Sequence, residues 1–125
     1  MTMDKWQAQH DFWNSFGVPA YEEHSVPDED KNIYPRITYE SAMSTFENLV
    51  AITASIWTRT TSWVTADTLA NTIEQYIKQM GCPEINGGRY RVFIGDTTFA
   101  QRMDDPNDDQ IKRIVLNVTF EFMTK

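Results

Sequence analysis

The chain has 125 residues, a hydrophobic fraction of 41% and a formal net charge of −7. This apolar content is too high for a disordered chain, and the length fits one domain with one core, so we expect a single folded domain over residues 1–125. The acidic balance argues against a general nucleic-acid-binding or anionic-membrane-binding protein, since both recognise basic surfaces.

The single cysteine, Cys82, excludes a disulfide within the chain and any metal cluster of several cysteines. No apolar run approaches the roughly 18 residues of a membrane helix, and the first residues carry no apolar signal core. Synthesis in the cytoplasm is therefore the expectation, and a particle assembled inside a cell would look the same.

The first predicted element is an amphipathic helix over residues 4–16, capped by Asp4 and ended by Gly17. Its apolar face is made by residues at helical spacing, namely Trp6, His10, Trp13 and Phe16. Residues 17–36 contain three prolines and an acidic run at 28–30, which favours an extended, partly exposed arm with room for a short strand at 18–22.

Four longer segments follow. Strand-like alternation begins at Ile37 and returns over 48–60, after a turn near 44–47. A helix is predicted over 65–80, with Thr65 as its cap and an apolar stripe through Leu69, Ile73, Ile77 and Met80. Alternation then predicts strands over 89–95 and 111–123, separated by a polar loop at 96–110. In these strands and in 48–60, the even-numbered residues form the apolar face. This order favours an α+β fold: a mostly antiparallel four-stranded sheet with two helices packed on one face.

The acidic loop around Pro106 is the most prominent polar feature, with Asp104, Asp105, Asp108 and Asp109. Clustered carboxylates can bind calcium or magnesium, but the ligand spacing of a helix–loop–helix calcium site is absent. A two-metal nuclease would need further carboxylates from other strands, and Glu121 is the only acid on its strand. We therefore favour a solvated turn or an interface loop, with the metal-dependent nuclease as a weaker alternative.

Other catalytic groups lack partners in the sequence. His10 falls on the apolar side of the first helix and His24 in a proline-bordered segment, while Cys82 follows a helix C-terminus, where the dipole disfavours a thiolate. No nucleophile elbow and no glycine-rich phosphate loop is present. We expect no enzymatic activity, no metal site and no cofactor.

Aromatic and basic residues alternate in two of the predicted strands, at Trp57 and Arg59 and at Arg91 and Phe93. Such residues can stack on single-stranded nucleic acid, but they are also the preferred anchors of protein interfaces, which the acidic composition favours. The predicted subunit or partner interface comprises Trp57, Arg59, Arg91, Phe93, Arg102, Asp104, Asp105, Asp108 and Asp109.

Several stretches resemble the tail-terminator, or tail-completion, proteins of long-tailed phages of Gram-positive bacteria. The first runs from Phe12-Trp13 through Gly17-Val18-Pro19-Ala20-Tyr21 to Val26-Pro27 and Tyr34-Pro35-Arg36-Ile37-Thr38-Tyr39. The others are Ser55-Ile56-Trp57-Thr58-Arg59, Thr98-Phe99-Ala100-Gln101-Arg102-Met103-Asp104-Asp105 and Ile114-Val115-Leu116-Asn117-Val118-Thr119-Phe120-Glu121-Phe122. The resemblance covers nearly the whole chain, including the order of elements.

This resemblance implies an α/β sandwich and a non-catalytic role in virion assembly. Members of that family form a hexameric ring that caps the finished tail tube, stops its polymerisation and provides the surface that joins the head. The implied partners are further copies of the chain, the major tail tube protein and a head-completion or connector protein, with DNA only as passing cargo. The implied location is the tail or neck of the virion. A different neck component, such as a head-closure or adaptor protein, is the alternative within the same particle.

Overall fold

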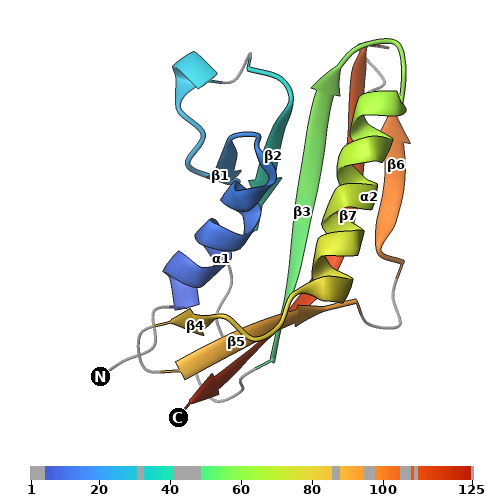
Figure 1. Ribbon diagram of the computed structural model, residues 1–125. Helices are drawn as coiled ribbons and strands as arrows, with labels where there is room; N and C mark the ends of the chain where they lie inside the picture. The colour runs from blue at the N-terminus through green and yellow to red at the C-terminus, as the bar shows by residue number, and fades with distance from the viewer. Residues whose placement is uncertain are drawn as a thin grey trace.

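The computed structural model describes residues 5–30, 33–40, 49–85, 88–94, 98–104, 108 and 110–124. The described residues form two α-helices, two short 3-10 helices and seven strands (Figure 1). In chain order these are α1 (Lys5–Trp13), η1 (Asn14–Phe16), β1 (Ala20–Glu22), η2 (Asp28–Asp30), β2 (Arg36–Tyr39), β3 (Leu49–Arg59), α2 (Val64–Gln79), β4 (Glu84–Ile85), β5 (Gly88–Phe93), β6 (Ala100–Asp104) and β7 (Ile111–Thr124).

One sheet contains all seven strands: six follow the order β1-β2-β3-β7-β5-β4, and β6 lies off this path, paired with β7. The long strand β7 organises it, pairing with β3 along one side over residues 111–121. On its other side, β6 pairs with residues 112–116 of β7 and β5 pairs with residues 119–124. Every pair is antiparallel except β1 with β2. Parallel neighbours need a connection of about a dozen residues or more, which residues 23–35 provide.

The α+β class is confirmed, as is the packing of both helices on one face of the sheet, but the expected count of four strands is wrong. β1 lies within the segment predicted to have room for a strand, whereas β4 and β6 were missed. β6 lies inside the predicted polar loop because its sequence, Ala-Gln-Arg-Met-Asp, lacks the alternation of a half-buried strand. Its order comes from backbone pairing with β7, a contact that no local pattern encodes.

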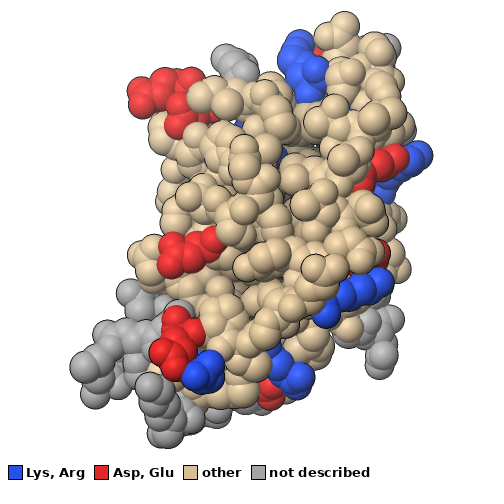
Figure 2. Space-filling model, viewed as in Figure 1, with Lys and Arg blue, Asp and Glu red and all other residues tan. Residues whose placement is uncertain are grey.

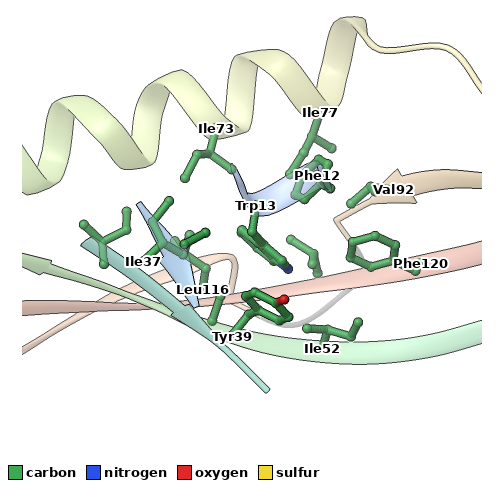
Figure 3. Packing of buried hydrophobic residues seen from close by; sticks show 14 of the residues in the cluster. Phe12, Trp13, Ile37, Tyr39, Ile52, Ile73, Ile77, Val92, Leu116 and Phe120 are labelled. Carbon is green, nitrogen blue, oxygen red and sulfur yellow. The ribbon is translucent and has the colours of Figure 1, made fainter. Parts of the chain in front are cut away.

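The core lies between the helices and the sheet, where α1 and α2 lie side by side on the same face (Figure 1). In β3, β5 and β7 the even-numbered residues point toward the helices, as the alternation predicted, and in β2 Ile37 and Tyr39 do so. Figure 3 shows Ile73 and Ile77 of α2 above the sheet and Trp13 of α1 against Tyr39 of β2. The largest fully buried side chains are Trp13, Phe12, Phe120, Phe122, Ile37, Ile52, Ile56, Ile73, Leu116 and Gln9.

Of the predicted helix ends, the stop at Gly17 is confirmed and the cap at Thr65 is not. Gly17 follows η1 with a φ of 83°, the left-handed conformation that makes glycine favourable at a helix end. The predicted cap by Thr65 is wrong: α2 begins one residue earlier, at Val64, and Trp63 caps it without a side-chain hydrogen bond. Instead, Ser62 Oγ accepts the Val64 N–H at 3.1 Å. Asp4, the cap predicted for the first helix, lies outside the described residues.

Tyr90 should make the stability of the fold depend on alkaline pH. Burial raises the pKa of its phenol to about 12, above the usual value near 10. The unfolded chain would therefore lose this proton first, so the contribution of Tyr90 to stability is complete below pH 10 and declines as the pH rises toward 12. We expect Tyr90→Phe to remove the latest component from an ultraviolet tyrosinate titration. An unchanged titration curve would contradict the assignment.

Candidate interaction surface on the open sheet face

The sheet face opposite the helices, here called the open face, is covered by neither α1 nor α2 (Figure 1). It is formed by the odd-numbered residues of β3, β5 and β7, because β-strand side chains alternate between faces. In β7 these residues are half-buried and of mixed character, namely Ile111, Arg113, Val115, Asn117, Thr119, Glu121 and Met123. A partly apolar sheet face without a helix on it is suited to contact with another protein.

A row of three residues crosses one end of the open face. Arg36, Trp57 and Arg113 are direct neighbours in β2, β3 and β7. The guanidinium carbons of Arg36 and Arg113 lie 5.7 and 4.7 Å from the centre of the Trp57 ring. Both arginines are thus within the range of cation–π attraction to one indole. We call this set the arginine–tryptophan row.

Hydrogen bonds to neighbouring hydroxyls fix the geometry of this row. Trp57 Nε1 donates to Thr38 Oγ1 at 2.9 Å, and Arg113 Nε donates to Ser55 Oγ at 3.0 Å. Thr38 and Ser55 are themselves buried beneath the row. The indole and the Arg113 guanidinium are therefore held in place in the free protein, which reduces the ordering cost of binding a partner.

A hollow of about 330 Å³ adjoins the row at the β2 end. Its lining combines the β2 and β3 side chains with residues that follow β1, and comprises Glu23, His24, Val26, Arg36, Thr38 and Trp57. The hollow thus offers apolar surface, hydrogen-bonding groups and charges of both signs next to the half-buried indole of Trp57.

His24, at the rim of this hollow, is paired with Glu22. The imidazole Nδ1 lies 3.1 Å from Glu22 Oε1, and the hydrogen bond to this carboxylate raises the pKa of His24 above its ordinary value. We expect Glu22→Gln to lower the pKa of His24 toward about 6.5, the value of an unperturbed histidine. Proton NMR titration of the two ring C–H signals of His24 would measure it, with the unsubstituted chain as the control.

A second group lies at the far end of the open face. Arg91 forms an ion pair with Glu121, and its guanidinium carbon lies 4.9 Å from the centre of the Phe93 ring. Along β7 this group is centred on position 121 and the row on position 113, so about 26 Å separates them. Trp57, Arg59, Arg91 and Phe93 therefore share one face, as their strand positions predicted, but do not form one continuous stacking strip.

Two further predicted interface residues, Asp108 and Arg102, lie on different sides of the sheet. Asp108 pairs with Arg59 of the open face at 3.1 Å and also accepts the Gln110 N–H. Arg102 lies on the helix side, where it pairs with Asp67 of α2 and covers the Trp63 ring at 5.0 Å. In Figure 2, which views the helix side, basic side chains prevail toward α2 and β6 and acidic ones toward α1 and η2.

The acidic loop itself is described only in part. Asp104 ends β6 opposite Lys112 of β7, whereas Asp105 and Asp109 lie outside the described residues. In the described part of the chain, no group of three or more His, Cys, Asp or Glu residues is arranged to hold a metal ion. Elsewhere, His10 is half-buried with its Nδ1 2.9 Å from the Tyr39 hydroxyl, which fits the structural role expected for it.

Two members of the row, Arg36 and Arg113, are absent from the predicted interface. The alternation of β7 placed Arg113 on the face opposite the core, which was the signal available for it. The register that brings Arg36, Trp57 and Arg113 into one line spans 77 positions of sequence, from 36 to 113, and is not visible in any single segment. Only the assembled sheet shows that they are adjacent.

Together, the fold and the open face define a small α+β domain with one helix-covered and one open sheet face. In structure the chain is similar to the protein in "Structure of bacteriophage SPP1 gp17 protein", with a TM-score of 0.52 and 15% sequence identity over 93% of this chain and 79% of that one. No protein-family model matches the sequence, and a search of curated proteins finds no match. The fold is thus one that occurs in a bacteriophage protein. No helix among the described residues is long and apolar enough to cross a membrane.

Proposed function

We propose that the chain is a structural subunit of a phage tail that caps the tail tube as a ring, ends tail polymerisation and provides the surface that joins the head. The observation that carries this proposal is the likeness to a bacteriophage protein across 93% of the chain. The sequence resemblance to tail-terminator proteins points independently to the same kind of particle. In this proposal the chain is not an enzyme and needs no cofactor.

The arrangement of surfaces supports a ring. A closed ring of identical subunits needs two different contact surfaces on each subunit, because one patch must meet another patch on the next copy. The chain offers the open face and, separately, the outer edge of β6, where Met103 is 44% exposed. Such an edge strand invites contact with another chain. The proposed partners are further copies, the tail tube protein and a head-completion or connector protein.

The acidic character of the chain fits a passage for DNA. A net charge of −7 disfavours adhesion of the phosphate backbone, so DNA leaving the head would be cargo and not a ligand. The proposed location is therefore the neck of the virion, between tube and head. A head-closure or adaptor protein would occupy the same region, and the two roles differ in which process fails when the subunit is missing.

Electron microscopy of particles assembled without this protein would test the proposal. A tail terminator predicts tubes of irregular, extended length and free heads, both corrected by supplying the chain from a plasmid. Tails of normal length beside unjoined heads would instead assign a head-closure or adaptor role. Normal infectious particles would refute a role in the neck altogether.

A further inference from the structure

We propose that the arginine–tryptophan row, with the hollow beside it, is a docking site for an acidic peptide segment of a partner protein. This proposal rests on the proposed function only in one respect, namely that the partner is a protein flanking the ring. The binding chemistry depends on the row alone, and it can be tested without any phage particle.

The charge balance of the described arginines motivates the proposal. Four of them, Arg59, Arg89, Arg91 and Arg102, form ion pairs with carboxylates of the chain. Arg113 differs: among the described residues it contacts the Ser55 hydroxyl and the Trp57 ring, and no carboxylate lies at ion-pair distance. In a chain with 18 Asp and Glu residues, a half-buried guanidinium set among neutral groups is available to an external anion.

Partial burial of Arg113 strengthens its electrostatic attraction to such an anion. A guanidinium among protein atoms has lost part of its hydration, and its attraction to a carboxylate is less screened than at a fully exposed site. Arginine also presents parallel N–H donors that match the two oxygens of a carboxylate. Since Arg113 Nε already donates to Ser55 Oγ, the terminal nitrogens of Arg113 are the donors that would bind the ligand.

The shape of the row suits a peptide. Arg36 and Arg113 are two strands apart, so their backbones are separated by about 9.5 Å, with the Trp57 ring between them. A carboxylate bound at Arg113 would place the neighbouring part of the segment on the indole, in the direction of Arg36. Tryptophan and arginine are the residues that most often dominate the binding energy of protein interfaces.

Nucleic acid is a poorer occupant of the same surface. Binding to a phosphate backbone needs a run of cations along the strand. Here the arginines of the open face beyond the row, Arg59 and Arg91, are neutralised by Asp108 and Glu121. A second copy of the chain is also disfavoured as the source of the acids. The acidic turn η2 begins two residues after Val26, which lines the hollow, so two copies exchanging it would use the same patch on each copy and close a pair and not a ring.

Titration of the isotope-labelled full chain, followed by two-dimensional NMR, tests the proposal. The probe is a ten-residue peptide of alternating glutamate and glycine, and its glutamine counterpart is the control. We expect the Trp57 indole N–H and the Arg113 Nε–H signals to shift with the glutamate peptide alone. Arg113→Gln should weaken binding about fivefold or more, the effect of losing one charge-assisted contact. Arg36→Gln, at the other end of the row, should weaken it in the same direction.

Arg89→Gln is the matched control, because Arg89 is an exposed arginine that pairs with Glu84 away from the row. Equal weakening by Arg89→Gln, or no shift at Trp57, would overturn the proposal. A thymidine decanucleotide that shifts the row where the peptide does not would assign the site to nucleic acid instead. Self-association abolished by Arg113→Gln, without peptide binding, would assign it to a second copy. Phage complementation separates the two proposals. If deletion of the chain causes a tail defect but the Arg113→Gln variant restores normal particles, only the docking site is refuted.

Discussion

Replacing Phe120 with alanine is expected to lower the free energy of unfolding by about 3–5 kcal/mol, the range for truncating a large aromatic residue in a packed core. Phe120 lies at the centre of β7, fully buried, at 0% exposure. Its ring meets Phe12 of α1 edge-on at 5.3 Å and stacks with Tyr90 of β5 at 6.0 Å. One truncation therefore opens a cavity between α1 and two strands of the sheet. A domain of this size has about 5–15 kcal/mol of stability in total, so the loss would be severe.

Urea denaturation followed by circular dichroism would measure this change, and Thr119→Ala provides the matched control. Thr119 is the adjacent residue of β7 but lies half-buried on the open face, so its truncation should cost less than about 1 kcal/mol. Similar losses in the two variants would contradict the assignment of faces in β7. If Phe120→Ala does not fold, Phe120→Leu should show the same order of effects at smaller size.

Hydrophobic alternation made much of this fold predictable. The faces of β3 and β7 were assigned correctly because their even-numbered residues are almost all apolar, as in Ile52 and Phe120. The α2 stripe through Ile73 and Ile77 was equally clear, since both are buried at helical spacing. The local sequence of these segments predicts which of their side chains are buried, and so they could be located without knowledge of their neighbours.

Elements defined by their neighbours could not be predicted in the same way. The described side chains of β6 are all exposed, and the formation of this strand depends on the side of β7 opposite β3 over residues 112–116. The parallel pairing of β1 with β2 likewise depends on where the 23–35 connection returns, which alternation does not specify. A pattern of period two reports which side chains are buried, and it leaves the identity of the neighbouring strand open.

The same distinction explains the candidate site. Trp57 and Arg59 could be named from the sequence because an aromatic residue near a basic one, on the polar face of a strand, is an interface signal within a single segment. The contribution of Arg113 depends on two facts about its surroundings: the register with Trp57 and the distance from any described carboxylate. The sequence alone does not distinguish the arginines at 59, 91 and 113. In the structure Arg59 and Arg91 are paired with carboxylates, whereas Arg113 belongs to the row proposed to bind an anion.

Trp13 should show a large difference between two substitutions at one position. Its indole is fully buried, packs edge-on against Phe12 at 4.8 Å and stacks with Tyr39 at 6.4 Å (Figure 3). Trp13→Ala is expected to cost about 3–5 kcal/mol, because it empties the space between α1 and the sheet. Trp13→Phe should cost less than half as much, although it also removes volume.

The reason lies in the Trp13 ring nitrogen. Nε1 is buried and has no hydrogen-bond acceptor among the described residues. A buried N–H without an acceptor costs about 1–3 kcal/mol, and phenylalanine would remove that cost while keeping an aromatic ring against Tyr39. Urea denaturation would compare both variants with Trp6→Phe, a control at a 51% exposed position where little change is expected. If Trp13→Phe proved as damaging as Trp13→Ala, the N–H would have an acceptor in solution, and the indole would anchor α1 through a hydrogen bond as well as through packing.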